Sequence, residues 1–527
     1  MPGKPARALL LVGLVTGLLV TASACGTTVP QSELDAASRG TGEVGIGGTV
    51  PTAAQQEPTD TATTAPGGAA APTASVTSGS ESGNAGGTVA VPVAGPTSGT
   101  SAPTTKGPST GAAHSTAVSS AAANTSPITI GMIYTGTSNA SSFGFNPENT
   151  VTEQNVDKAL IDAYNKQGGL DGRRIVPVYA STDTGSSSWN NDFQAACSTF
   201  TQDHHVAAVL GYQFTYVPGF ESCLNKAGVP HLETGFNVPD AAELDQYPLH
   251  RALQVPTIER RQLAKFDGAI ATGVLTPASK LGVLLDSCPG TERSWNAVTK
   301  PYLDAHHINV VYTTVTSCVD GANSSQSDAV SQIPSAILAL RSKGVDRIAF
   351  AATSEGPVLF VVSVAAQAQG YHPTYIMSSL GNLAQLQSQM PRPQAENVKG
   401  FGWIPDQDVA PSQYPPQNPS QKRCVAMLKS QGINLSSAAD YDLGYNVCEA
   451  FFVYERALQT THGDSTGTTI IKAVDGIGTS LPSVTSLDGK AVYSNARRNA
   501  APASVRPVVF SDGCSCFTYT GTARPMP

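Results

Sequence analysis

From residue 128 onward, short apolar runs alternate with amphipathic stretches. Residues 128–134 predict a buried strand, and residues 153–166 repeat apolar side chains at the three- and four-residue spacing of one helical face. The alternation continues to residue 233, with strands expected at 173–179, 206–210 and 231–233 and helices at 191–202 and 217–227. Strands that alternate with helices are typical of a mainly parallel sheet covered on both faces.

A second series of the same kind begins after Pro256. We expect strands at 281–285, 310–315, 347–352 and 375–378, with helices at 293–305, 328–342 and 357–369. Helical stretches at 421–431, 438–459 and 468–474 follow, and strand-like pieces at 490–493 and 506–510 precede the last two cysteines. The pattern predicts two α/β lobes, in which a ligand lies beyond the carboxyl ends of the strands.

The start of the chain has a different texture. Basic residues precede an apolar run at 8–20 that is too short to span a bilayer, and small residues lead to Cys25. We expect residues 1–25 to be an export signal. Two routes fit: Ala22 and Ala24 form a site for ordinary secretion, and together with Cys25 they resemble a bacterial lipobox, whose cysteine is lipidated after cleavage.

Residues 26–127 consist mostly of Ser, Thr, Ala, Gly and Pro. Such a segment cannot bury enough apolar surface to offset its ordering entropy, so we expect a disordered linker. A flexible chain of this length would hold the globular part roughly 50–60 Å from its anchor.

The charge of the chain limits the classes of partner that it can bind. Charged residues are 13% of the chain, and the net charge is −8. An acidic balance argues against a nucleic-acid partner, because phosphate binding needs a basic face. After the leader no segment approaches about 18 consecutive apolar residues, so we expect no membrane-spanning helix.

The chain has nine cysteines, an odd number for an exported protein. Setting Cys25 aside for a lipid leaves four pairs that are close in sequence, which favours the lipoprotein route. We expect four disulfides: Cys197–Cys223, Cys288–Cys318, Cys424–Cys448 and Cys514–Cys516. No pair has zinc-finger spacing with nearby histidines, so we expect no metal ion and no cofactor.

Two further motifs are of kinds that occur in enzymes. Residues 463–467 match G-x-S-x-G, but a nucleophile elbow follows a strand, and here a helix precedes the motif. His204 and His205 follow a helix in what we interpret as a solvated loop. We therefore expect no catalytic residues and no enzyme.

Several segments resemble one family. The strand at 128–134, the turn at 167–175, Gly228-Val229-Pro230-His231 and Tyr441-Asp442 are similar to extracellular solute-binding proteins of the type I periplasmic fold, in the branch of the branched-chain amino-acid receptors of ABC importers. The resemblance implies two Rossmann-like lobes with parallel sheets, joined by a three-stranded hinge. It places lobe one at 128–254 plus 401–485 and lobe two at 255–400 plus 486–527.

The resemblance also implies where a ligand binds. Lobe one would contribute the loops at 211–215 and 234–237, and lobe two would contribute strand-end residues. A hydroxyl at Thr215 suits a ligand carboxylate, and a helix N-cap is an equal alternative for it. The candidate ligand-binding residues are Thr135, Tyr212, Gln213, Thr215, Phe236, Asn237, Asp286, Ser354, Glu355 and Ser379.

The ligand itself is constrained by Leu380. Amino-acid receptors of this branch place an acidic residue near this position to hold the ligand ammonium, and the apolar residue argues against a simple α-amino acid. Tyr134, Tyr212, Phe214 and Phe236 suit an amide, a sugar or an aromatic ligand.

The resulting hypothesis is a monomeric, lipid-anchored receptor on the extracytoplasmic face of a bacterial membrane. It would trap a small polar solute between two lobes and deliver it to an ABC permease. A surface protein that senses a ligand or recognises a partner with the same fold, without transport, is the alternative. A secreted hydrolase is the third hypothesis, because fold alone does not settle function.

Overall fold

The structure is a computed structural model of the chain, which divides into two units, residues 1–111 and 112–527. The described residues all belong to the second unit: 125–135, 149–183, 189–213, 217–235, 239–318, 326–352, 355–494 and 501–527. The expected leader, Cys25 and all but the end of the expected linker lie outside them. Among the described residues, no helix is long and apolar enough to cross a membrane.

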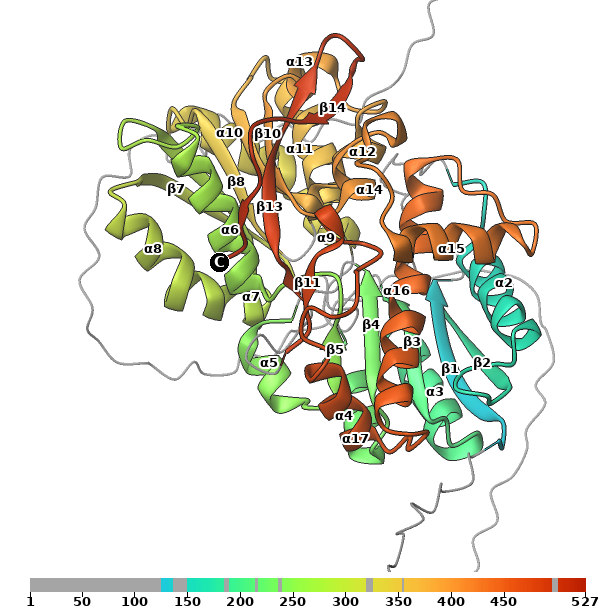
Figure 1. Cartoon of the computed structure of the whole chain (residues 1–527). Helices are drawn as coiled ribbons and strands as arrows, with labels where there is room; N and C mark the ends of the chain where they lie inside the picture. The colour runs from blue at the N-terminus through green and yellow to red at the C-terminus, as the bar shows by residue number, and fades with distance from the viewer. Residues whose placement is uncertain are drawn as a thin grey trace, which may run out of the picture. The chain divides into compact units, whose positions relative to one another are not determined.

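The first sheet is parallel throughout, in the order β2-β1-β3-β4-β5 (Figure 1). Its strands are β1 (Ile128–Thr135), β2 (Ile175–Thr182), β3 (Ala208–Gln213), β4 (His231–Gly235) and β5 (His250–Ala252). Its helices are α2 (Glu153–Lys166), α3 (Trp189–Ser198), α4 (Pro218–Ala227), α5 (Ala241–Gln246), α15 (Pro419–Lys429), α16 (Ala438–Thr460) and α17 (Gly467–Asp475). We call this part lobe one.

Lobe one has a core on each side of its sheet. Alternate residues of a strand point to opposite faces, so Met132 packs with α2, α15, α16 and α17, whereas Ile133 packs with α3 and α4. Figure 1 shows the late helix α16 beside β3 and β4, although it follows these strands by some 200 residues in the chain, and α17 packs against α16. The late segments therefore complete the first lobe.

The second sheet has the order β14-β13-β10-β9-β8-β6-β7, with β15 paired to β13. Five of its strands are parallel: β6 (Lys280–Asp286), β7 (Asn309–Thr316), β8 (Arg347–Ala351), β9 (Thr374–Ser378) and β10 (Val398–Gly402). Three antiparallel strands from the chain end extend it: β13 (Ser504–Ser511), β14 (Cys516–Tyr519) and β15 (Arg524–Pro525). We call this part lobe two.

Helices cover both faces of the second sheet. Val283 of β6 packs with the cluster that contains α6 (Ile258–Ala271), and its neighbour Leu284 packs with the opposite cluster, which contains α10 (Ile333–Ser342) and α11 (Gly356–Ala368). The remaining helices are α7 (Pro289–Ser294), α8 (Lys300–Ala305), α9 (Gln326–Ser331), α12 (Leu383–Leu386), α13 (Arg392–Ala395) and α14 (Pro405–Asp408). A small sheet pairs β11 (Ala491–Val492) with β12 (Ala501–Pro502).

The four expected disulfides are confirmed: Cys197–Cys223, Cys288–Cys318, Cys424–Cys448 and Cys514–Cys516. The first joins α3 to α4, and the third joins α15 to α16. Each pair therefore fastens neighbouring segments of one lobe, and none of these four disulfides joins the two lobes.

The sequence-based expectation of two α/β lobes with parallel sheets is confirmed, and a few details differ. The three-residue strand β5 and the short helices α5, α12, α13 and α14 were not expected, because each is too short to show a period, and the expectations also missed α6 and β10. The last strands were placed before Cys514, but Cys516 itself opens β14.

Candidate functional site

The parallel strands of each sheet end at one edge, where their carboxyl ends present side chains and backbone N–H groups. In lobe one the strands end at Thr135, Thr182, Gln213, Gly235 and Ala252. In lobe two the parallel strands end at Asp286, Thr316, Ala351, Ser378 and Gly402. Ligands of open α/β folds lie at such edges, so these ends and the loops after them form the candidate site.

The chain passes between the lobes three times beside this site. The first crossover follows β5 and leads into α6, and its Gln254 accepts a hydrogen bond from Gly235 N at the end of β4 (3.1 Å). The second leads from β10 through Trp403 to α14. The third, at 484–490, lies against the second, because Leu487 N donates to Trp403 O (2.6 Å).

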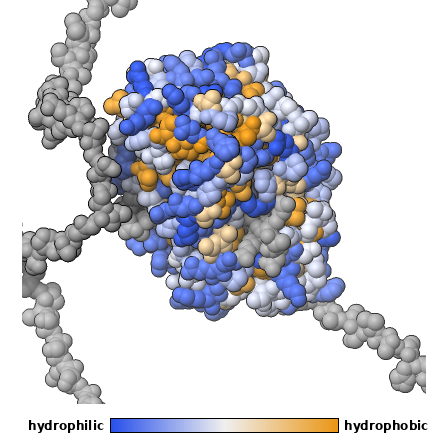
Figure 2. All heavy atoms as spheres, turned by 90° about the vertical axis from the view of Figure 1, so that its left-hand side faces the viewer, coloured by the Kyte–Doolittle hydropathy of each residue, from blue (hydrophilic) through white to orange (hydrophobic). Residues whose placement is uncertain are grey.

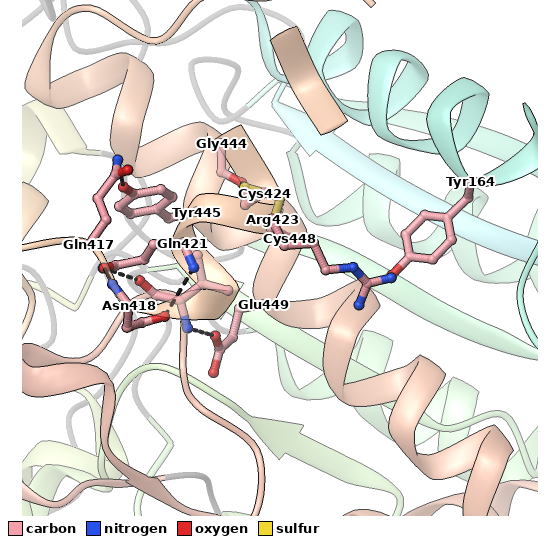
Figure 3. Close-up of a disulfide and its surroundings, with 11 residues drawn as sticks. Tyr164, Gln417, Asn418, Gln421, Arg423, Cys424, Gly444, Tyr445, Cys448 and Glu449 are labelled. Carbon is pink, nitrogen blue, oxygen red and sulfur yellow. Dashed lines mark hydrogen bonds between the residues drawn. A yellow bond between two sulfur atoms is a disulfide. The ribbon is translucent and has the colours of Figure 1, made fainter. Parts of the chain in front are cut away.

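The third crossover is held by polar side chains of α15 and α16, on the helices joined by the Cys424–Cys448 disulfide (Figure 3). Gln421 Nε2 donates to Val484 O (2.8 Å), and Glu449 accepts from Val484 N (2.5 Å). Asn418, the N-cap of α15, donates to Ser483 O (2.8 Å). These hydrogen bonds therefore hold the start of the third crossover against α15 and α16 of lobe one.

In lobe two, the expected ligand residue Glu355 is fully buried and bonded within the protein. Its Oε1 lies 2.9 Å from Lys265 Nζ and 3.7 Å from an Arg261 nitrogen. Its Oε2 accepts from both the N–H and the hydroxyl of Ser378, each at 2.8 Å. Burial lowers the Lys265 pKa to about 8, against the opposing pull of Glu355. Glu355 thus ties α6 and the end of β9 together beside the candidate site.

Asp286 is the second acid of this group. It is 7% exposed at the end of β6, and its Oδ1 accepts from Cys288 N (3.1 Å). The negative charges of Glu355 and Asp286 act on the Arg261 guanidinium. Its Nη2 group donates a hydrogen bond to Ala352 O (2.6 Å), just after β8. Two cations, Arg261 and Lys265, therefore face two carboxylates at this edge.

Ser379 connects the edge to the second crossover. Its hydroxyl accepts from Trp403 N (2.7 Å), and its O–H donates to Asp408 Oδ2 (3.2 Å). The same Asp408 oxygen accepts from Ile404 N (3.0 Å) and from the Tyr519 hydroxyl (2.7 Å). Burial nevertheless raises the Asp408 pKa to about 7. Ser379 is fully buried, so it acts on the second crossover from within lobe two.

A pair of acids, Asp406 and Asp442, lies where α14 meets α16. Both are buried, and Asp442 also accepts from Asn446 Nδ2 (2.8 Å). Burial raises the Asp442 pKa to about 6, and burial together with the neighbouring Asp442 carboxyl raises that of Asp406 well above its ordinary value. The second crossover therefore carries groups that hold protons near neutral pH.

An ion pair joins the two lobes directly. Arg293 on α7 of lobe two lies 2.6 Å from Asp240 and 3.1 Å from Glu243, both on lobe one. Asp240 is the N-cap of α5, with a reciprocal Glu243 capping bond. Asp286 is the last residue of β6. The segment that follows β4 in lobe one thus lies close to the segment that follows β6 in lobe two.

The other expected site residues divide into two groups. Thr135 is half-buried at the end of β1, and its N–H donates to Glu153 Oε2 (3.0 Å). Tyr212 and Gln213 end β3, opposite Thr234 and Gly235 of β4. The side chains of Tyr212 and Gln213 lie outside the described part of the structure, as do Thr215, Phe236, Asn237 and Ser354 in full.

Sequence reasoning missed the Arg293 pair and the acids of the second crossover. The D-x-x-E spacing of Asp240 and Glu243 is a capping signal that predicts the start of α5. No local pattern links them to Arg293, some fifty residues later. In the sequence, Asp406 and Asp408 cannot be told from ordinary exposed loop acids, because only the tertiary fold buries them.

No protein-family model matches the chain, and no curated protein matches its sequence. Solved structures do match its fold. One is the solute-binding protein of an ABC transporter from Rhodopseudomonas palustris BisB5 in complex with 3,4-dihydroxybenzoic acid (TM-score 0.53, 14% identity, 76% of this chain and 98% of that one). The chain has the two-lobed type I periplasmic-binding fold.

Two further structures have the same fold. A solute-binding protein from Rhodopseudomonas palustris HaA2, in complex with p-hydroxybenzoic acid, matches with a TM-score of 0.54 and 16% identity over 76% of this chain and 97% of that one. A substrate-binding protein from Desulfitobacterium hafniense in complex with Leu matches with a TM-score of 0.50 and 16% identity over 75% and 100%. These neighbours are ligand-binding receptors of ABC transporters, and they bind different small molecules on one fold.

Proposed function

We propose that this protein is a lipid-anchored extracytoplasmic solute-binding receptor that traps a small polar ligand between its two lobes for an ABC importer. The observation that carries the proposal is the arrangement of strand ends: the carboxyl edges of two parallel sheets lie beside three crossovers, and the Arg293 ion pair joins loops of the two lobes. Two lobes that close about such crossovers can enclose a ligand between them. No catalytic role is assigned to any residue.

The ligand is proposed to be an amide, a sugar or an aromatic molecule and not a simple α-amino acid. Leu380 packs in the core of lobe two, so it offers no carboxylate to a ligand ammonium. The described acids nearby, Asp286 and Glu355, face Arg261 and Lys265. A buried ammonium without a free acid would be costly. Two of the structural neighbours bind hydroxybenzoic acids, which carry no ammonium.

A thermal-shift screen over amino acids, amides, sugars, nucleosides and hydroxybenzoic acids tests this proposal. A ligand at 100 times its Kd stabilises the folded state by about 2.7 kcal/mol, which is enough to raise the midpoint visibly. We expect a shift with one of the ammonium-free classes and none with leucine, isoleucine, valine or glutamine. Micromolar binding of any of these four amino acids would disprove the exclusion and leave the receptor proposal standing.

Partner recognition without transport is the second candidate, and an apolar surface on lobe two favours it. Val315 of β7, Leu338 of α10 and Val364 of α11 are 54%, 58% and 45% exposed. Figure 2 looks onto the side where β7 lies in Figure 1 and shows apolar atoms gathered in the upper half of this face. If no solute in the screen binds, partner recognition without transport becomes the better-supported function.

A further inference from the structure

A cluster of metal-ligating side chains lies inside lobe one, away from the candidate site. Glu221 of α4, His231 at the start of β4 and His250 at the start of β5 are each at most 2% exposed. One ligand atom from each lies within 4.8 Å of the others. His231 Nδ1 is 3.0 Å and 3.1 Å from the two Glu221 oxygens, and His250 Nδ1 is 3.9 Å from Glu221 Oε2.

The fold makes this cluster from residues that are ten and nineteen positions apart in sequence. His231 and His250 are register partners on adjacent parallel strands, so their rings stack with centroids 5.2 Å apart. Glu221 reaches them from α4, two residues before Cys223 of the disulfide to α3. Because both strands begin here, the cluster lies at the edge of the sheet opposite the candidate ligand site.

A second carboxylate orients one of the ligands. His250 Nε2 lies 3.0 Å from Glu233 Oε2, and both side chains are 1% exposed. A proton on Nε2 that donates to Glu233 leaves the Nδ1 lone pair directed towards Glu221 and His231. Metal-ligating histidines are commonly held in this way, by a carboxylate on the nitrogen that does not bind the metal.

The electrostatics suit a cation. Two carboxylates, Glu221 and Glu233, contact the imidazoles of His231 and His250, and all four side chains are buried. The nearby guanidinium of Arg251 is engaged with Asp475 (2.9 Å and 2.7 Å).

We propose that Glu221, His231 and His250 bind one zinc ion, with Glu233 as the carboxylate that orients His250. Tetrahedral zinc with bond lengths of about 2.0–2.1 Å places its ligand atoms roughly 3.3 Å apart. Glu221 lies 3.0 Å from His231 and 3.9 Å from His250, and all three ligand atoms are within 4.8 Å of one another. Two imidazoles and a carboxylate are donors that zinc accepts. The ion would fasten α4 to β4 and β5 and so stabilise lobe one, independently of the proposed receptor function.

The test begins with the full chain, purified without chelator and then dialysed against Zn²⁺ or Co²⁺. We expect one metal ion per chain by plasma mass spectrometry, a rise in the melting temperature with Zn²⁺ that a chelator reverses, and the visible absorption bands of a Co²⁺ ion with nitrogen and oxygen ligands. Because these readouts use the unaltered protein, they do not depend on whether a variant folds. A chain that binds neither metal and melts at the same temperature with and without Zn²⁺ overturns the proposal.

Variants then locate the ion. His231→Gln and Glu221→Gln keep the side chains close in size, and we expect each to lower zinc affinity at least tenfold and to abolish the Co²⁺ bands. His204→Gln is the matched control, because His204 is exposed outside the cluster, and we expect it to keep the metal. If the metal stays with His231→Gln and Glu221→Gln and leaves with His204→Gln, the ion binds elsewhere and the proposal is wrong.

Discussion

At the scale of single residues, the junction between the lobes depends on acids that the fold buries. Asp408 receives hydrogen bonds from Ile404 N and from the hydroxyls of Ser379 and Tyr519, yet burial keeps its pKa far above that of a free aspartate. Such a group is more easily protonated in the folded chain than in the unfolded one. The second crossover therefore changes its charge near neutral pH.

This argument gives a pH prediction. The Asp408 pKa rises from 3.8 unfolded to about 7 folded, and each pKa unit corresponds to about 1.4 kcal/mol. Between these values the folded state binds more protons, so its contribution to stability is present at low pH and is lost as the pH rises towards 7. We expect Asp408→Asn to flatten the fall of the urea midpoint between about pH 4 and pH 7.

The exposed Asp304, which pairs with Lys300 on the surface of α8, supplies the control Asp304→Asn. Its urea midpoints should follow those of the unaltered protein across the same pH range. Parallel midpoint curves for Asp408→Asn and the unaltered protein would show that this carboxyl titrates alike in the folded and unfolded states.

At the scale of elements, sequence patterns predict what is local and periodic. The apolar run that became β1 and the amphipathic stretch that became α2 are visible because burial repeats with a fixed period. The cysteine pairs were predicted because partners are close in sequence. The cluster of Glu221, His231 and His250 has no fixed spacing, since it depends on two strands being neighbours in the sheet. For the same reason, the sequence-based expectation of no metal ion considered only the cysteines and the pair His204 and His205.

The disulfide between α15 and α16 gives an element-scale prediction. It closes a loop with a sequence separation of 24, whereas Cys514–Cys516 spans a separation of 2. In the chain-entropy account the longer loop contributes about 3.5 kcal/mol and the shorter one less than half as much. We expect the double change Cys424→Ser with Cys448→Ser to lower the melting temperature clearly more than the change of Cys514 and Cys516 to Ser. Equal losses by calorimetry would contradict this ranking.

At the scale of the whole molecule, the account depends on how the lobes meet. The described part of the junction combines three crossovers with the ion pair of Arg293, Asp240 and Glu243. The strand-end residues of lobe two were predicted as ligand groups, and the structure shows Glu355 and Ser379 bonded within the lobe. The sequence could place them at the strand ends, but not reveal which neighbours would occupy their polar atoms.

The interlobe ion pair predicts an effect on ligand affinity. Arg293 is 46% exposed, so water screens its pairs and we expect them to contribute about 1 kcal/mol. For the solute that the screen identifies, Arg293→Ala should raise the Kd by roughly fivefold. Arg392→Ala removes an exposed arginine whose partners Glu396 and Asp512 both lie in lobe two, and it should leave the Kd unchanged. An equal effect of both variants would show that the interlobe ion pair does not contribute to ligand affinity.

The proposed anchor gives a prediction outside the described residues. If Cys25 carries the lipid, Cys25→Ala should move the protein from the membrane fraction to the medium, because the remaining chain has no expected membrane-spanning helix. Fractionation followed by immunoblotting measures this directly. A Cys25→Ala protein that remains with the membrane would show that the anchor assignment is wrong.

The central claim is that both lobes grip one solute, and calorimetric titration of matched single-hydroxyl variants tests it most directly. Thr215→Ala removes an expected ligand group from lobe one, and Ser354→Ala removes one from lobe two. Titrated with the solute that the screen identifies, each variant should bind at least tenfold more weakly than the unaltered protein, a loss of about 1.4 kcal/mol. A solute whose affinity falls with only one of the two variants, or with neither, would contradict a ligand held between the lobes.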